Sequence, residues 1–202
     1  MGRAREFDFE EALDLATRQF WEKGYAGTSL DDLTAAMGIS RPSLYRAFGN
    51  KEALFKRAVE YFEKEYLGFI DEALRKSTIR NLVRSLLEGT IRACAGASTP
   101  TGSLLTHGAP ASPPEDEKVR LLLASRIAAY EQKLSERLDL AAAEAELPAG
   151  VDRAGLAAFI TTYCCGVALR AKGGATPGAL MAELPFVMAA VPAAEKGTPA
   201  FR

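Results

Sequence analysis

The feature that most restricts the fold is a helical spacing of apolar residues, which recurs along nearly the whole chain. Between residues 79 and 94 the apolar positions follow one another at intervals of three, four and seven, and a second stripe of this kind runs through residues 119–138. This spacing places apolar side chains on one face of an α-helix, and strand-like alternation is nearly absent. The sequence therefore predicts an all-α protein.

Capping and helix-breaking residues divide this pattern into separate helices. Asp8 is a typical N-terminal cap, and Gly24 is a natural stop for the first helix. Either Thr28 or Ser29 is expected to cap the second helix, and Ser40 the third. The helices expected in this half of the chain span residues 8–23, 30–37, 41–48 and 51–75.

The second half of the chain continues the pattern with longer helices. Residues 96–114 are rich in Gly, Pro, Ser and Thr, and they leave room for one short helical piece around Leu104. Pro185 is expected to kink the last helix. The helices expected here span residues 79–94, 114–146, 152–172 and 176–190.

Bulk composition restricts the class of protein without naming a partner. Hydrophobic residues make up 48% and charged residues 25% of the chain, which is ordinary for a globular protein, and the net charge is -1. We find no apolar run of the roughly 18 residues that a membrane span requires and no signal-peptide core, so we expect a cytoplasmic protein. The cysteines, 3 in all, are too few for a disulfide framework.

Two short helices joined by a turn that contains Gly38 form the pattern of a helix-turn-helix. On a helical wheel of residues 41–48, Leu44 and Phe48 lie on the inner side, whereas Tyr45 and Arg46 lie on or beside the outer side. The outer side therefore offers the hydroxyl, aromatic and guanidinium groups that contact bases and phosphates.

Local charge supports this interpretation. Residues 40–57 contain five positive side chains and one negative, whereas residues 1–57 as a whole contain nine of each. Positive charge is therefore concentrated around the third helix, and any DNA binding through it should weaken steeply with salt.

The run from Phe20 to Phe55, FWEKGYAGTSLDDLTAAMGISRPSLYRAFGNKEALF, resembles the DNA-binding head of TetR-family transcriptional regulators. The resemblance extends over about residues 9–62. The features that carry the resemblance occur in order: the helix spacing, the glycine of the turn, the Leu-Tyr pair and the closing Lys-Glu-x-Leu. The resemblance implies an all-α fold with an N-terminal three-helix head and a larger C-terminal helical bundle that forms a dimer.

The resemblance also implies roles for individual residues of the head. Arg41 and Pro42 would touch bases, Tyr45 would meet a phosphate or a thymine methyl group, and Ala47 stands where many relatives carry His or Tyr. Contacts with phosphates would come from Ser29, Ser43, Arg46 and Lys51. Arg3 and Arg5 of the N-terminal arm would reach the minor groove. The complete set of candidate DNA-binding residues is Thr28, Ser29, Ser40, Arg41, Pro42, Ser43, Tyr45, Arg46 and Lys51.

A homodimer through the last two long helices is a further implication, and the sequence supports it independently. Residues 156–169 carry no charge on any face of the expected helix. Such a helix must be covered on all sides, by its own core and by a partner. A twofold dimer would bind a near-palindromic operator on double-stranded DNA.

For the body, the resemblance implies a pocket for a small apolar or aromatic ligand. The candidate lining residues are Tyr66, Leu104, His107, Tyr130, Phe159 and Tyr163. We expect no cofactor and no metal, because a lone His107 beside neutral loop residues makes a poor metal site. Ser103 stands where a subset of these regulators often carries Cys, so a thiol mechanism is not expected at that position.

The domains implied are a helix-turn-helix domain over residues 1–52, a ligand-binding and dimerisation domain over residues 53–191, and a flexible tail over residues 192–202. We expect a ligand-responsive repressor. A helical-bundle enzyme is disfavoured, because the sequence has no second histidine for a di-iron pair and no nucleophile or phosphate-binding motif. A third possibility is a thiol- or metal-responsive sensor on the same scaffold, using Cys94, Cys164 and Cys165, although we expect these to be core residues.

Overall fold

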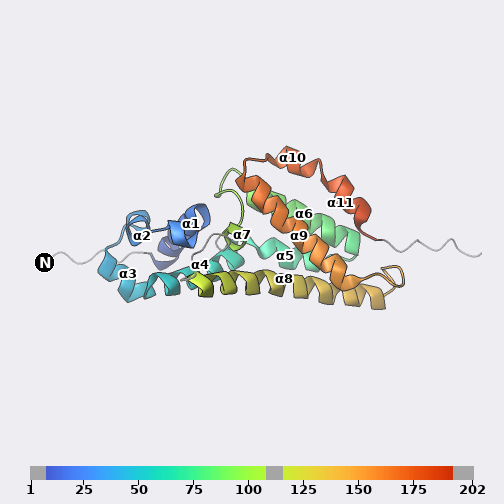
Figure 1. Ribbon diagram of the computed structural model, residues 1–202, viewed down its shortest axis with the longest axis horizontal. Helices are drawn as coiled ribbons and strands as arrows, with labels where there is room; N and C mark the ends of the chain where they lie inside the picture. The colour runs from blue at the N-terminus through green and yellow to red at the C-terminus, as the bar shows by residue number, and fades with distance from the viewer. Residues whose placement is uncertain (1–7, 108–115, 193–202) are drawn as a thin grey trace, which may run out of the picture.

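The computed structural model describes residues 8–107 and 116–192, and over these ranges it confirms the all-α prediction, with helices and no strands. The helices form an elongated molecule (Figure 1). Their bounds are α1 Phe9–Gly27, α2 Leu30–Met37, α3 Arg41–Phe48, α4 Lys51–Tyr66, α5 Gly68–Leu74, α6 Ile79–Ala95, α7 Leu104–His107, α8 Glu117–Ala143, α9 Arg153–Lys172, α10 Pro177–Met181 and α11 Leu184–Ala190.

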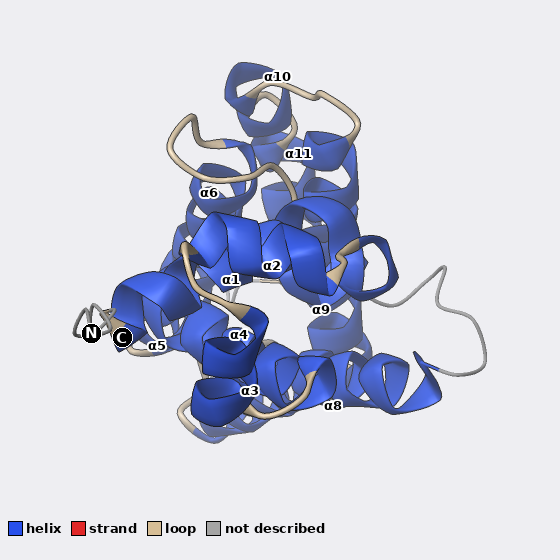
Figure 2. Ribbon diagram, turned by 90° about the vertical axis from the view of Figure 1, so that its left-hand side faces the viewer, coloured by secondary structure: helices blue, strands red, loops and turns tan. Residues whose placement is uncertain are grey.

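Helices α1, α2 and α3 form a head at one end of the molecule, and α6, α9, α10 and α11 form a body at the other (Figure 1). The long helix α8 runs along the base of the body, and its first turns pack against the core of the head (Figure 1). Figure 2 looks onto the head, with the helices of the body behind it. The expected tail and arm, residues 193–202 and 1–7, lie outside the described residues.

The helices of the head lie where the sequence predicts them. The bounds of α2 and α3 match the prediction, and Ser29 rather than Thr28 caps α2. Gly38, with φ 64°, ends α2 in the left-handed region that glycine adopts without strain. Gly24 breaks α1 as expected, with φ 74° and ψ 173°, but helical turns resume and carry the element on to Gly27.

Two of the predicted helices are wrong, since each is divided into two. The helix expected over residues 51–75 ends at Tyr66 and starts again at Gly68, with Leu67 between them at φ -111° and ψ 9°. Gly68 is a poor helix former, and the bend buries Leu67. The last helix breaks at residues 182–183 instead of kinking, because Pro185 cannot donate the hydrogen bond that would continue α10 into α11.

The apolar core consists of two clusters with different contents. The first joins the head to α4, α7 and the first half of α8, and it contains Phe20, Trp21, Phe55 and Phe62 at 0–1% exposure. The second fills the body with aliphatic side chains of α6, α9, α10, α11 and the second half of α8. The core of the head therefore continues through α4, beyond residue 52.

Helix α9 departs from the expectation that no segment is long and apolar enough to span a membrane. By length and composition it is apolar enough to cross one. Within the bundle it packs against both α6 and α8. A core helix of a bundle meets the same criteria, so this property does not indicate a membrane.

Candidate DNA-binding surface and internal cavity

The two faces of α3 separate as the helical wheel predicts. Leu44 and Phe48 are 0% and 2% exposed, and the ring of Phe48 stacks on that of Phe9 with centroids 4.6 Å apart. Arg41, Tyr45 and Arg46 are exposed to solvent. The inner face therefore fixes α3 to the head while its polar face remains accessible.

Hydrogen bonds at its two ends hold α3 in place. Ser40 caps the first turn by accepting from the backbone N–H of Ser43, with their hydroxyl oxygens 2.9 Å apart. At the other end, Nη1 of Arg57 donates to the carbonyl of Ala47 over 3.3 Å. A guanidinium at a helix C-terminus also interacts favourably with the helix dipole. Arg57 was counted in the sequence only as local charge, because nothing local predicts this contact across ten residues.

Arg41 is engaged by the neighbouring helix. Its Nε and Nη2 donate to the same Oδ1 of Asp31 on α2, over 3.2 and 2.8 Å. Both side chains are exposed, so this is a surface ion pair of modest strength. The guanidinium must leave or share this carboxylate before it can contact a base.

A capping box fixes the start of α2. The Ser29 hydroxyl accepts from the backbone N–H of Asp32, while the Asp32 carboxylate accepts from the backbone N–H of Ser29. Nζ of Lys23 also donates to Asp32. The hydrogen bond from Lys23, followed by those from Ser29, lowers the pKa of Asp32 well below its ordinary value.

Two other candidates have surroundings that the sequence does not reveal. Thr28 is buried, and its hydroxyl donates to the carbonyl of Gly24 over 2.6 Å, so it stabilises the kink in α1. Nζ of Lys51 lies 4.3 Å from the ring centroid of Tyr25, and partial burial lowers the pKa of this lysine. Lys51 is therefore held against the head by a cation–π contact.

A polar cluster links the head to the body. Arg18 of α1 donates to the Tyr66 hydroxyl at the end of α4 and to the carbonyl of Ser98, in the loop before α7, both over 3.1 Å. Its Nε also donates to Asp14, and Tyr66 donates to the same carboxylate. Burial, with this hydrogen bond to Asp14, raises the pKa of Tyr66 to about 12. We call these four residues the head–body link.

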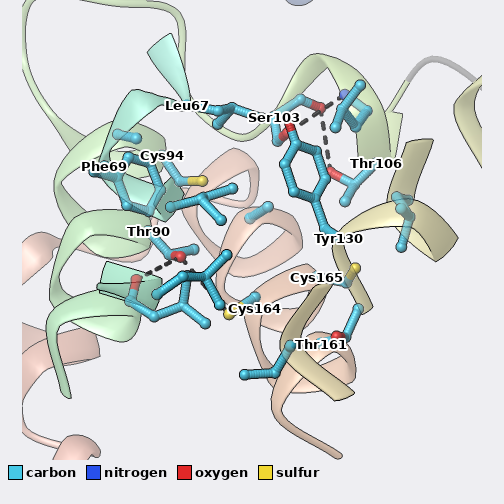
Figure 3. A pocket seen from close by; sticks show the side chains of 18 residues that line it. Leu67, Phe69, Thr90, Cys94, Ser103, Thr106, Tyr130, Thr161, Cys164 and Cys165 are labelled. Atoms are coloured by element: carbon cyan, nitrogen blue, oxygen red, sulfur yellow. Dashed lines mark hydrogen bonds between the residues drawn. The ribbon is translucent and has the colours of Figure 1, made fainter. Parts of the chain in front are cut away.

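A cavity of about 100 Å³, partly open to solvent, lies in the body between α5, α6, α7, α8 and α9 (Figure 3). Its wall includes Leu67 at the α4–α5 bend, Phe69, Thr90 and Tyr130. Cys94, Cys164 and Cys165 line the same cavity, although they come from two helices.

Few of the pocket residues predicted from the sequence line this cavity. Tyr130 lines it, whereas Tyr66 belongs to the head–body link and Leu104 is buried in the core of the head. Phe159 and Tyr163 border a separate hollow along α9, together with Arg170 and Glu183. His107 ends α7, and its side chain lies outside the described residues. The predicted residues are distributed over different surroundings because sequence gives the spacing along a helix but not the angle at which two helices meet.

The three cysteines are free thiols in apolar surroundings. Burial raises the pKa of Cys94 and of Cys164 to about 12, and it raises that of Cys165 as well. Among residues 8–107 and 116–192, no cluster of His, Cys, Asp or Glu has the arrangement of a metal site.

Together, an exposed polar helix on a three-helix head and a bundle behind it define a helix-turn-helix DNA-binding protein. Residues 12–58 match the family model described as bacterial regulatory proteins, tetR family. The chain is 34% identical to the TetR family transcriptional regulator CifR, solved as a cysteine mutant with 26-bp double-strand operator DNA; the match has a TM-score of 0.90 and covers 94% of this chain and 100% of that one. This chain therefore belongs to the TetR family of transcriptional regulators and is not an enzyme.

Two further relatives agree with this assignment. The HTH-type transcriptional repressor ComR of Escherichia coli is 29% identical over 182 residues, which cover 89% of this chain and 87% of ComR. A putative TetR transcriptional regulator from Rhodococcus sp. is 33% identical, with a TM-score of 0.63, and the match covers 91% of this chain and 98% of that structure.

Proposed function

We propose that the protein is a ligand-responsive homodimeric repressor that binds a palindromic operator in the cytoplasm. The observation that carries this proposal is α3, whose inner face is buried at Leu44 and Phe48 while its polar face is exposed. A helix held rigidly by one face can enter the major groove with the other.

Within this proposal, Arg41 and Pro42 contact bases, and Tyr45 contacts a phosphate or a thymine methyl group. The proposed phosphate contacts come from Ser29, Ser40, Ser43, Arg46 and Lys51. Thr28 does not contact DNA, because its side chain is buried and its hydroxyl binds Gly24. Arg3 and Arg5 retain their proposed place in the minor groove, although they lie outside the described residues.

The homodimer is supported by apolar surface on the C-terminal helices. Phe159 and Leu169 of α9 are 43% and 65% exposed, and Phe186 of α11 is 79% exposed. Large apolar side chains exposed on a helical bundle are candidates for an interaction surface. A twofold pairing of this surface would place two copies of α3 on successive turns of the major groove.

The ligand response is supported by the position of the cavity. Leu67 lies both in the cavity wall and at the end of α4, the helix that continues from the head into the body. The end of α6 lines the cavity at Cys94, and the segment after α6 lines it at Ser103 and meets the head through Ser98. A ligand that binds two arrangements of these elements unequally, with a coupling of about 1–3 kcal/mol, would suffice to change operator affinity.

The proposal is tested by a mobility-shift assay on the DNA upstream of the protein's own gene. We expect a shift that weakens steeply with salt and maps to a near-palindrome. The absence of any salt-sensitive shift on palindromes there would refute repression at that site.

A thiol-responsive regulator on the same scaffold is the second candidate, favoured by the three cysteines that share one cavity. Their raised pKa values oppose it, because a neutral thiol reacts slowly. Replacing all three with serine decides the question. An unchanged response to oxidants and metals in a reporter strain removes this candidate.

A further inference from the structure

The wall of the cavity restricts what can enter it. Among the lining residues that the structure describes, none is Asp, Glu, Lys, Arg or His. Burial of an ion is very costly unless an opposite charge or several hydrogen bonds receive it. This wall offers no charged group to receive an ion.

Four of the five hydroxyl-bearing side chains of the wall, those of Thr90, Ser103, Thr106 and Tyr130, are already hydrogen-bonded to the protein, and Thr161 is the fifth. The Thr90 hydroxyl donates to the Leu86 carbonyl over 2.8 Å, and the Tyr130 hydroxyl is hydrogen-bonded to the carboxylate of Glu63. The surface presented to an occupant is therefore mostly carbon and sulfur. The thiols remain neutral at neutral pH, because burial raises their pKa values.

The size of the cavity sets a second limit. Its volume of about 100 Å³ is smaller than that of an engineered cavity of about 150 Å³, lined by Leu, Ile and Phe in another protein, that binds benzene. A single ring or a short branched chain fits after small movements of the wall. Larger ligands would have to displace the helices around it.

We infer that the cavity binds a compact, uncharged, largely apolar molecule, about the size of one aromatic ring, without a covalent bond to the cysteines. The inference rests on the proposed ligand response only in naming this cavity as the effector site. The binding itself needs no DNA.

The test uses the full chain and three probes of similar size: benzyl alcohol, benzoate and benzylammonium. Calorimetric titration without DNA should detect the neutral probe and show each charged probe to bind roughly a hundredfold more weakly or not at all, because the cavity cannot compensate an ion. Equal or tighter binding of either ion overturns the inference. No binding of benzyl alcohol up to its solubility limit overturns it as well.

Location is tested by filling the cavity. Ala93 of α6 lines it, whereas Ala124 of α8 is exposed, so Ala93→Leu and Ala124→Leu form a matched pair. Cys165→Leu is a second filling variant that keeps the test valid should Ala93→Leu fail to fold. We expect each filling variant to lose about tenfold or more in affinity for benzyl alcohol, and Ala124→Leu to bind like the unmodified protein. Unchanged binding by both filling variants places the probe elsewhere and refutes the inference.

The same probe separates this inference from the proposed function. Binding in the cavity together with weaker operator affinity supports both. Binding in the cavity with unchanged operator affinity supports the inference and refutes the proposed ligand response through this site.

Discussion

The head and the body of this protein are both helical, but their interiors differ in a way that fits two tasks. The core of the head packs aromatic rings against one another: Phe20 and Phe55 meet edge to face at 5.0 Å, and so do Trp21 and Phe62 at 4.7 Å. The body surrounds a cavity of about 100 Å³ with aliphatic side chains, thiols and few rings. Densely packed interiors transmit small shifts instead of absorbing them, whereas a cavity leaves room for an occupant.

The largest effect should come from the core of the head. Leu44→Ala removes a side chain that is 0% exposed, and we expect it to lower the free energy of unfolding by about 2–5 kcal/mol. Tyr45→Ala, next to it but 49% exposed, should leave stability nearly unchanged and weaken operator and random DNA alike. Urea denaturation and DNA titration measure the two effects. Equal stability losses would show that α3 is not anchored by one face.

Replacing a small side chain with a larger one should distinguish the core of the head from the cavity of the body. Ala16 is 0% exposed in the core of the head, so Ala16→Leu should cost about 1–3 kcal/mol through overpacking. The same change at Ala93 enters the cavity and should cost less than about 1 kcal/mol. Thermal unfolding of both variants measures this difference. A larger loss for Ala93→Leu would contradict the contrast between packed head and hollow body.

The junction between head and body depends on the Tyr66 hydroxyl. Tyr66→Phe removes its hydrogen bonds with Asp14 and Arg18, and we expect a loss of about 1 kcal/mol in unfolding free energy with faster hydrogen exchange at the end of α4. Tyr61→Phe, on the same helix, is the control, because it keeps the ring contact of Tyr61 with Tyr66 and removes none of the hydrogen bonds of the head–body link. Similar hydrogen exchange in both variants would show that the Tyr66 hydroxyl does not stabilise the junction between head and body.

A smaller effect is expected at the DNA surface. Asp31→Asn removes the carboxylate that holds Arg41, so the guanidinium becomes free for a base, and we expect DNA affinity to rise roughly twofold to fivefold at low salt. Fluorescence anisotropy with labelled operator measures the gain. Glu22→Gln removes an equal charge from an exposed position on α1 and serves as the control. An equal gain in the control would attribute the effect to net charge alone.

The same contrast explains how much could be predicted from the sequence. Bounds and faces in the head follow from local chemistry, namely the Ser29 and Ser40 caps, the Gly38 stop and the inner position of Leu44. The division at Leu67 escapes prediction, because the apolar periodicity continues across it and tertiary packing decides where the helix turns. At Pro185 the sequence predicts a distortion, but not that the helix breaks two residues earlier.

The candidate site residues show the same dependence on local sequence and on tertiary packing. The exposed residues of α3 were identified correctly because one wheel sorts the residues of one helix. Of the residues expected to line a ligand pocket, Tyr130 lines this cavity whereas Tyr66, Leu104, Phe159 and Tyr163 lie elsewhere, because the wall comes from helices far apart in the sequence. Cys94, Cys164 and Cys165 were expected to be core residues, and all three line this cavity, because the two adjacent cysteines share one face of α9 with Thr161 and Ala168.

The central claim is that α3 reads DNA from a twofold dimer. Selection of bound sequences from a random DNA pool by the full chain tests it most directly. The account predicts enrichment of a near-palindrome whose half-site centres lie about 10 bp, or a multiple of this, apart, with relaxed preference for Arg41→Ala. Enrichment of no common sequence, or of the same sequence with equal preference by Arg41→Ala, would contradict it.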